Sequence, residues 1–81
     1  MLRREPRRGT VYQVWSERWG AETFILVASP QDAVPEGVLP VSLRAPLALF
    51  LAACNPGERR VFIEDDGEQV EYEIRQVYTL Q

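Results

Sequence analysis

Residues 41–57 decide the fold, and they read Val-Ser-Leu-Arg-Ala-Pro-Leu-Ala-Leu-Phe-Leu-Ala-Ala-Cys-Asn-Pro-Gly. The stretch predicts a short helix over residues 46–54, because proline fits a first helical turn and leucine and alanine favour helix. Asn55-Pro56-Gly57 is expected to end the helix. This is the one helix that the sequence predicts, so the rest of the chain is expected to form strands and loops.

The predicted helix has no polar face. One side is expected to face the core and carries larger apolar residues: Leu47, Phe50, Leu51 and Cys54. The opposite side is expected to carry small residues around one large one: Ala48, Ala52, Ala53 and, near its centre, Leu49. A short helix without a polar face either lies under a second layer or forms a contact surface. Leu49 is therefore a candidate contact residue.

Two strands are predicted before the helix. Residues 10–15 are rich in β-branched and aromatic side chains, and residues 23–28 form an apolar run typical of a strand buried on both faces. The polar residues 16–22 suit a hairpin loop, so the two strands are expected to pair antiparallel. Residues 29–40 contain three prolines and are predicted to form an ordered loop or crossover without a long element.

Two further strands are predicted after the helix, over residues 61–63 and 70–75. Asp65-Asp66-Gly67 lies between them and is typical of a hairpin turn, because glycine tolerates the positive φ that the turn needs. Apolar and charged residues alternate in the last strand, and the change of parity after it indicates a bulge or bend near Gln76. The order predicts an α+β, FKBP-like fold, in which an antiparallel β-sheet clasps one short α-helix.

The composition excludes most familiar enzyme chemistry. The chain has 81 residues, a net charge of −3, no histidine and one cysteine. Without an imidazole there is no Ser-His pair, and a single cysteine cannot form an internal disulfide or a cysteine-rich zinc site. We therefore expect one small domain that is not an enzyme and has neither a cofactor nor a metal site.

The arginines divide the chain into an arm and a body. Four of the nine lie in residues 1–8, a basic arm that precedes the domain at residues 9–81. We expect this arm to be a solvated tail without specific nucleic-acid binding, because the acidic body repels phosphates. A lone cysteine, no apolar run long enough to cross a membrane and no signal peptide together predict a cytoplasmic protein without membrane contact.

Three other features invite a functional interpretation. The acidic cluster at residues 64–68 lacks the ligand spacing of an EF-hand, so a solvated hairpin is expected. Trp19 leaves two interpretations open: an exposed binding residue, or a side chain folded over the sheet edge beside Trp15. Cys54 is expected to be a buried thiol. Ser42 is expected to be a cap or a loop hydrogen-bonding residue, since no base is available to activate it.

Taken together, residues 9–78 resemble the C-terminal domain of the bacterial Gre transcription-elongation factors of the GreA/GreB type. The family segment Y-T-I-V-G-P-x-E-A-D-P corresponds to Phe-Ile-Leu-Val-Ala-Ser-Pro-Gln-Asp-Ala-Val-Pro at residues 24–35. The family segment I-S-x-x-S-P-L corresponds to residues 41–47, and the closing Y-E-I corresponds to residues 72–74. The chain departs from the pattern at Ala45, where the family has serine, and at Ala53, where it has glycine.

This resemblance implies a domain that binds the RNA polymerase β′ subunit at the rim helices of the secondary channel. The family's N-terminal coiled coil, with its acidic tip, has no counterpart in the few residues before the match. The resemblance therefore implies a regulator that does not stimulate transcript cleavage and competes with Gre factors. The contact residues that it implies are Ser42, Leu43, Arg44, Ala45, Pro46 and Leu47. Leu49 is added on the physical argument above.

Two enzymatic alternatives remain. An FKBP-type peptidyl-prolyl isomerase shares the fold but needs an aromatic-lined pocket, and the chain has eight aromatic residues, several of which the core is expected to use. A MazF-like small β-barrel toxin is suggested by residues 8–14 followed by an apolar strand. The acidic balance is unfavourable for a surface that cleaves RNA.

Overall fold

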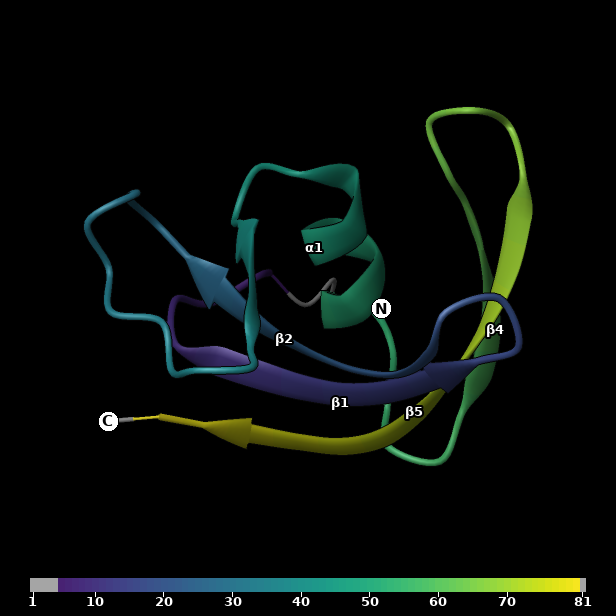
Figure 1. Cartoon of the computed structure of the whole chain (residues 1–81), viewed down its shortest axis with the longest axis horizontal. Coiled ribbons are helices and arrows are strands. Elements are labelled where there is room, and N and C mark those ends of the chain that lie inside the picture. The colour runs from purple at the N-terminus through teal and green to yellow at the C-terminus, as the bar shows by residue number, and fades with distance from the viewer. Residues whose placement is uncertain (1–4, 81) are drawn as a thin grey trace.

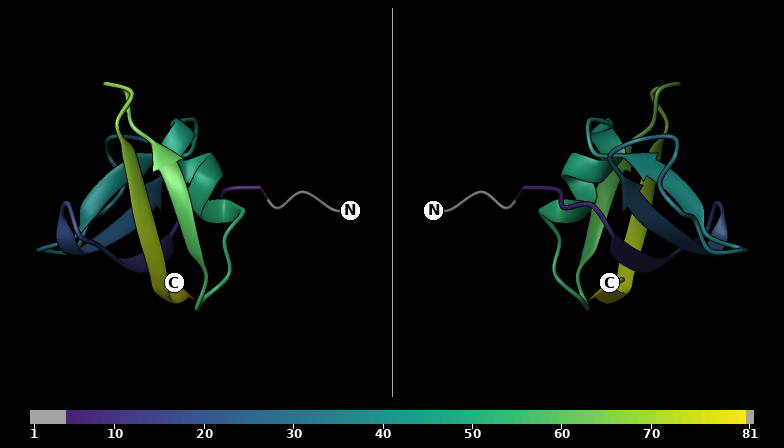
Figure 2. Two further views of the ribbon diagram at one scale, coloured as in Figure 1. Left: turned by 90° about the vertical axis from the view of Figure 1, so that its right-hand side faces the viewer. Right: turned by 90° about the vertical axis from the view of Figure 1, so that its left-hand side faces the viewer.

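A computed structural model describes residues 5–80 and contains five strands and one helix. In chain order these are β1 (Thr10–Ser16), β2 (Gly20–Val27), β3 (Leu39–Ser42), α1 (Pro46–Ala52), β4 (Arg59–Ile63) and β5 (Gln69–Thr79). The strands form one sheet in the order β3-β2-β1-β5-β4. The sheet curls around α1, and the β4–β5 hairpin rises beside the helix (Figures 1 and 2). The predicted α+β class is confirmed.

The sheet is mixed, so the prediction of a wholly antiparallel sheet is wrong at one edge. β1 pairs antiparallel with β2 and β5, and β4 pairs antiparallel with β5. β3, however, runs parallel to β2, with Leu26 opposite Val41. The connection after β2 crosses back along the sheet before the chain pairs again, which gives β3 the same direction as β2. Because residue 40 is a proline, the sequence predicted a loop here rather than a strand. Proline is nevertheless tolerated in an edge strand.

The crossover between β2 and β3 is held by Asp32. Its Oδ2 accepts hydrogen bonds from the backbone N–H groups of Ala28 (2.7 Å) and Ser29 (3.3 Å), and its Oδ1 pairs with Arg8 at 3.1 Å. The carboxylate therefore orders the start of the connection, as the prediction of an ordered crossover requires. Arg8 belongs to the predicted basic arm, whose residues 1–4 lie outside the described part of the chain.

A bulge interrupts the pairing of β1 with β5 where the sequence predicted one. Gln13 lies opposite Gln76, but the next residue, Val14, lies opposite Ile74, so β5 carries one extra residue at this point. Beyond the bulge, Val77 packs against the core and Tyr78 is exposed. The extra residue shifts the register by one, so buried and exposed side chains alternate again beyond the bulge. This shift explains the change of parity in the sequence.

The core lies between α1 and the concave face of the sheet. It contains Tyr12, Val14, Phe24, Leu26, Val41, Ala48, Leu51, Cys54, Val70, Tyr72 and Ile74. On the other face of the sheet, Val11 lies opposite Ile25, and both are buried. The run Phe24, Ile25 and Leu26 is therefore buried on both faces, as predicted. The hairpin between β1 and β2 is tighter than expected, since only residues 17–19 separate the strands.

The helix differs from its prediction in length and in orientation. It ends at Ala52 rather than at residue 54, and the N–H groups of Ala53 and Cys54 bond to carbonyls three residues earlier. Ala48 and Ala52 are buried, although they were expected on the outer side. The curled sheet covers more than one side of the helix, and small side chains allow its backbone to approach closely. Leu49 is 55% exposed, as expected.

Candidate protein-binding surface

The loop that leads into α1 is fixed by short-range hydrogen bonds. The N–H of Leu43 donates to the carbonyl of Val27 (3.0 Å), which extends the pairing of β2 with β3 by one bond. The Ser42 Oγ accepts from the N–H of Arg44 (3.2 Å), and the Ser42 carbonyl accepts from the N–H of Ala45 (2.9 Å). Ser42 is thus the loop hydrogen-bonding residue that the sequence predicted.

Ala45 and Pro46 set the start of the helix. Ala45 is extended, with φ −70° and ψ 146°, which is the conformation that a following proline favours. Its carbonyl accepts from the N–H groups of Ala48 (3.0 Å) and Leu49 (3.3 Å). Alanine at this cap position provides no side-chain hydrogen bond to the first turn. A serine here would satisfy one more backbone N–H.

The seven predicted contact residues divide into two groups. Four have exposed side chains: Ser42, Arg44, Pro46 and Leu49. Three are half-buried and pack against the core: Leu43, Ala45 and Leu47. Pro46 and Leu49 lie three residues apart on the helix, so they share one face. We call the four exposed residues the helix-entry surface.

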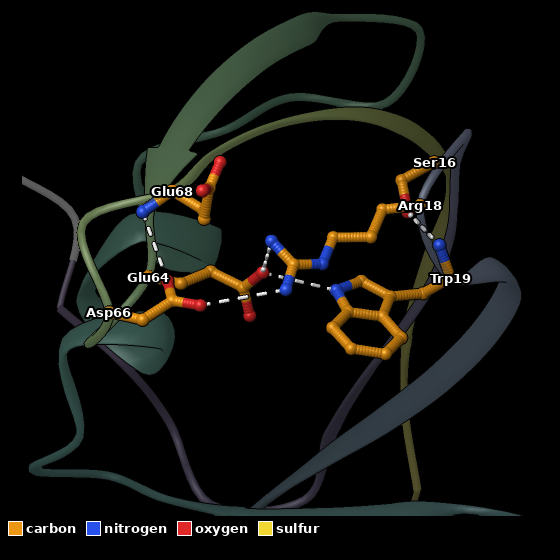
Figure 3. Close-up of polar contacts among 6 residues, drawn as sticks. All are labelled: Ser16, Arg18, Trp19, Glu64, Asp66 and Glu68. Atoms are coloured by element: carbon orange, nitrogen blue, oxygen red, sulfur yellow. Dashed lines mark hydrogen bonds and ion pairs between the residues drawn. The ribbon is translucent and has the colours of Figure 1, made fainter.

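A second polar cluster joins the tips of the two hairpins (Figure 3). Arg18 in the β1–β2 turn pairs with Glu64 and with Asp66, both at 3.5 Å. The indole Nε1 of Trp19 donates to Glu64 Oε1 at 3.2 Å, and the Arg18 guanidinium lies 4.8 Å from the centre of the Trp19 ring. The Trp19 N–H also donates to the buried Ser16 Oγ at 3.1 Å. We call Ser16, Arg18, Trp19, Glu64 and Asp66 the hairpin cluster.

The hairpin cluster resolves the question of Trp19. The side chain is 49% exposed, yet its polar end is held by the opposite hairpin. Trp15 lies against a different cation, since the guanidinium carbon of Arg75 is 5.6 Å from the centre of its ring. No local sequence pattern predicts this arrangement, because residues 19 and 64 are brought together only by the order of the strands.

The acidic segment is a hairpin turn, as predicted. The Glu64 N–H donates to the Glu68 carbonyl at 2.8 Å, and the Gly67 N–H donates to the Glu64 carbonyl at 2.8 Å. Gly67 has φ 84°, the left-handed conformation that this turn requires. Within residues 5–80, no three His, Cys, Asp or Glu side chains are grouped as metal ligands would be.

Glu22 and Tyr72 lie on the inner side of the hairpin cluster. The Oε1 atom of Glu22 is buried and has no hydrogen-bond partner in the part of the chain that the structure describes. Burial, and secondarily the charge of Glu64, raises the pKa of Glu22. Burial, followed by the charges of Glu22 and Glu64, raises the pKa of Tyr72 to about 12. This end of the core therefore disfavours negative charge, which the sequence did not indicate because Glu22 was assigned to a polar loop.

Cys54 is a buried thiol, as predicted. It is 3% exposed, and its Sγ donates to the carbonyl of Phe50 at 3.2 Å. Burial raises the pKa of this thiol, which keeps it protonated at neutral pH.

No helix among the described residues has the length and apolar character needed to cross a bilayer.

Comparison with solved structures identifies the class of fold as that of a prokaryotic transcription elongation factor. One matching structure is that of the prokaryotic transcription elongation factor GreA/GreB from Nitrosomonas europaea, with a TM-score of 0.61 and 18% sequence identity. The match covers 95% of this chain and 63% of the other. No protein-family model and no curated protein matches the sequence. At this identity the likeness establishes a Gre-like fold.

Proposed function

We propose that this protein binds RNA polymerase through the helix-entry surface, at the rim helices of the β′ subunit beside the secondary channel. It regulates transcription there without stimulating transcript cleavage, and it competes with Gre factors for the site. The observation that carries the proposal is the Gre-like fold combined with a 55% exposed leucine, Leu49, at the loop–helix segment that the resemblance assigns to the polymerase.

The chemistry of the helix-entry surface supports a protein partner. Complete burial of a leucine contributes about 1.5–3 kcal/mol, so covering the exposed half of Leu49 contributes roughly half of that. Arg44 is exposed and makes no ion pair with any described residue. Five other arginines are ion-paired: Arg8, Arg18, Arg59, Arg60 and Arg75. An exposed apolar side chain and an unpaired cation on the same loop–helix segment suit a partner helix with acidic and apolar residues.

The proposal that the chain is not an enzyme rests on how its candidate groups are used. Glu64 and Asp66 are held by Arg18 in the hairpin cluster. Phe50 packs against Phe62 and Tyr72, with ring centres 5.1 and 6.1 Å apart, so these aromatic rings fill the space between helix and sheet. We expect a proline-isomerisation assay on a short peptide to give the background rate, and overexpression to produce no RNA cleavage.

A transcript-cleavage assay tests the proposal. Core RNA polymerase stalled in a backtracked complex is supplied with a Gre factor from the same host and increasing amounts of this protein. The wild type is expected to suppress cleavage and to stimulate none alone. Leu49→Arg is expected to lose this suppression. Val34→Arg places the same charge on an exposed apolar residue in the β2–β3 crossover and is expected to behave as wild type. Equal suppression by both variants would contradict the assignment.

A further inference from the structure

Strand β4 leaves one edge of the sheet open. It lies last in the strand order and, within residues 5–80, pairs only with β5. The Glu64 N–H donates to Glu68, and the Glu58 carbonyl accepts from Ile74, so residues 58 and 64 bond toward β5. Because bonded pairs alternate along an antiparallel ladder, the even-numbered residues between them also face β5. The backbone groups of Arg59, Val61 and Ile63 therefore point outward.

This edge carries few of the features that usually protect an edge strand. Proteins shield such edges with prolines, bulges, central charges or a covering segment. In β4 the central outward-pointing residues are apolar, and Val61 and Ile63 are 50% and 62% exposed on the same face of the sheet. Charged residues lie only at the two ends, with arginines at positions 59 and 60 and acidic residues at 64 and 65.

The charges at the two ends of β4 have opposite sign. A second copy that runs antiparallel to the first therefore brings its acidic end to the basic end of the first copy. Two antiparallel copies centred on Phe62 place Val61 opposite Ile63 of the second copy. The same register places Arg60 opposite Glu64 and Arg59 opposite Asp65. Val61 and Ile63 then form the hydrogen-bonded pairs, as their outward-pointing backbone groups require. Apolar residues thus meet apolar ones. The two arginines meet acids at the start of the hairpin turn: Arg59 meets Asp65, and Arg60 meets Glu64, which also bonds to Arg18 and Trp19 of its own chain.

Neighbouring registers lose this complementarity. Centring the pair on Val61 brings Glu58 opposite Glu64 and Arg60 opposite Phe62. Centring it on Ile63 brings Phe62 opposite Glu64. An odd shift would place side chains from opposite faces of the sheet against each other. The charge pattern therefore selects one register.

We propose that two copies of this chain pair antiparallel along β4, in the register centred on Phe62, to form one continuous sheet. A twofold axis relates the copies, so every contact occurs twice. The existing ion pairs of Arg59 with Glu73 and of Arg60 with Glu58 are exposed, so these arginines can share a second acid at little cost. The contact is small and gives a reversible dimer, with a dissociation constant of roughly 10–500 µM. It uses none of the helix-entry residues, so it goes beyond polymerase binding.

Sedimentation equilibrium between about 5 µM and 1 mM tests for the dimer. The wild type is expected to fit a monomer–dimer equilibrium in the range given above. Val61→Pro removes an N–H that points away from β5, so the internal ladder stays intact while pairing with a second copy is blocked. This variant is expected to be monomeric throughout, with an unchanged circular dichroism spectrum. Leu49→Arg is the matched control and is expected to dimerise as wild type does. A monomeric wild type, or a dimer lost in Leu49→Arg and kept in Val61→Pro, would overturn the proposal.

A charge-swap series tests the register without relying on proline. Arg59→Asp alone places two acids opposite each other, and Asp65→Arg alone places two arginines opposite each other. Each single variant is expected to dimerise at least fivefold more weakly than wild type. An equimolar mixture of the two restores both opposite-charge pairs in a heterodimer and is expected to recover association. Failure of the mixture to associate better than either variant alone would reject this register.

Discussion

The helix-entry surface and the hairpin cluster each expose one large apolar side chain, yet the two regions differ in what holds that side chain. Leu49 is 55% exposed and Trp19 is 49% exposed. The Trp19 indole bonds to Glu64 and lies under the Arg18 guanidinium, whereas Leu49 projects from the side of α1 that the sheet leaves uncovered. Exposure alone therefore does not identify a binding residue. Trp19 links two hairpins of its own fold, and Leu49 remains available to a partner.

Truncation of Trp19 is expected to have the largest effect on stability. Trp19→Ala removes the hydrogen bond to Glu64 and the stacking of Arg18, so it should destabilise the fold by about 1–2 kcal/mol. For a domain of this size the melting temperature should fall by roughly 4–16 °C. Polymerase binding should stay within about twofold of wild type once the protein is folded. Loss of binding without loss of stability would assign Trp19, rather than Leu49, to the interface.

A substitution at the helix cap is expected to raise the stability of the fold rather than lower it. Ala45→Ser adds a hydroxyl at an extended cap position that has no side-chain hydrogen bond. The variant should be more stable by about 0.5–1 kcal/mol, as measured by urea unfolding. Ala45→Val is the control, because valine enlarges the side chain without a hydroxyl and is as poor a cap residue as alanine, so it should not reproduce the gain. A serine variant no more stable than wild type would show that the N–H groups of this turn are already satisfied.

Substitution of Glu22 is expected to change stability least, and the size of this change depends on pH. Its pKa is raised in the folded chain, so the folded state holds this proton more readily than the unfolded state does. The charged carboxylate therefore opposes folding, and stability falls as pH rises from the ordinary glutamate pKa through the raised one. Glu22→Gln should be more stable than wild type at pH 7, by less than about 1 kcal/mol, and the difference should vanish in acid.

Other carboxylates titrate in the opposite sense, so the comparison of Glu22→Gln with wild type is needed to isolate Glu22. The N–H of Asn55 lowers the pKa of Glu58, and a hydrogen bond from Arg75 lowers the pKa of Glu73. Protonation of these two groups destabilises the fold as pH falls below the ordinary glutamate range. Thermal melts of the wild type and of Glu22→Gln from pH 3 to 8 measure the difference in stability between them. A difference independent of pH would contradict the assignment to Glu22.

Local sequence patterns predicted most of the elements because each depends on neighbouring residues. The α1 start at Pro46, the turn at Gly67 and the bulge near Gln76 all follow from short-range chemistry. The parallel strand β3 could not be predicted, since it is short, contains Pro40 and is defined only by its pairing with β2. The burial of Ala48 and Ala52 was missed for a related reason. Helical periodicity assumes one covered face, but the sheet curls around the helix.

The sequence predicted the exposure of Leu49 but not the hairpin cluster. The exposure of Leu49 was predicted from its position around a single helix, so the sequence of one segment was sufficient. The hairpin cluster joins Arg18 to Glu64 and Asp66 across two hairpins that are distant in the sequence. The buried Oε1 of Glu22 likewise depends on the packing of several strands. Contacts of this kind become visible only when the strand order is known.

Equilibrium binding of this protein to core RNA polymerase tests the central claim most directly. The titration compares wild type, Leu49→Arg and Val34→Arg against polymerase with intact rim helices and polymerase with the tip of those helices deleted. Our account predicts binding by wild type and Val34→Arg, at least tenfold weaker binding by Leu49→Arg, and no binding by any of the three to the truncated polymerase. Binding that survives both the deletion and Leu49→Arg would contradict it.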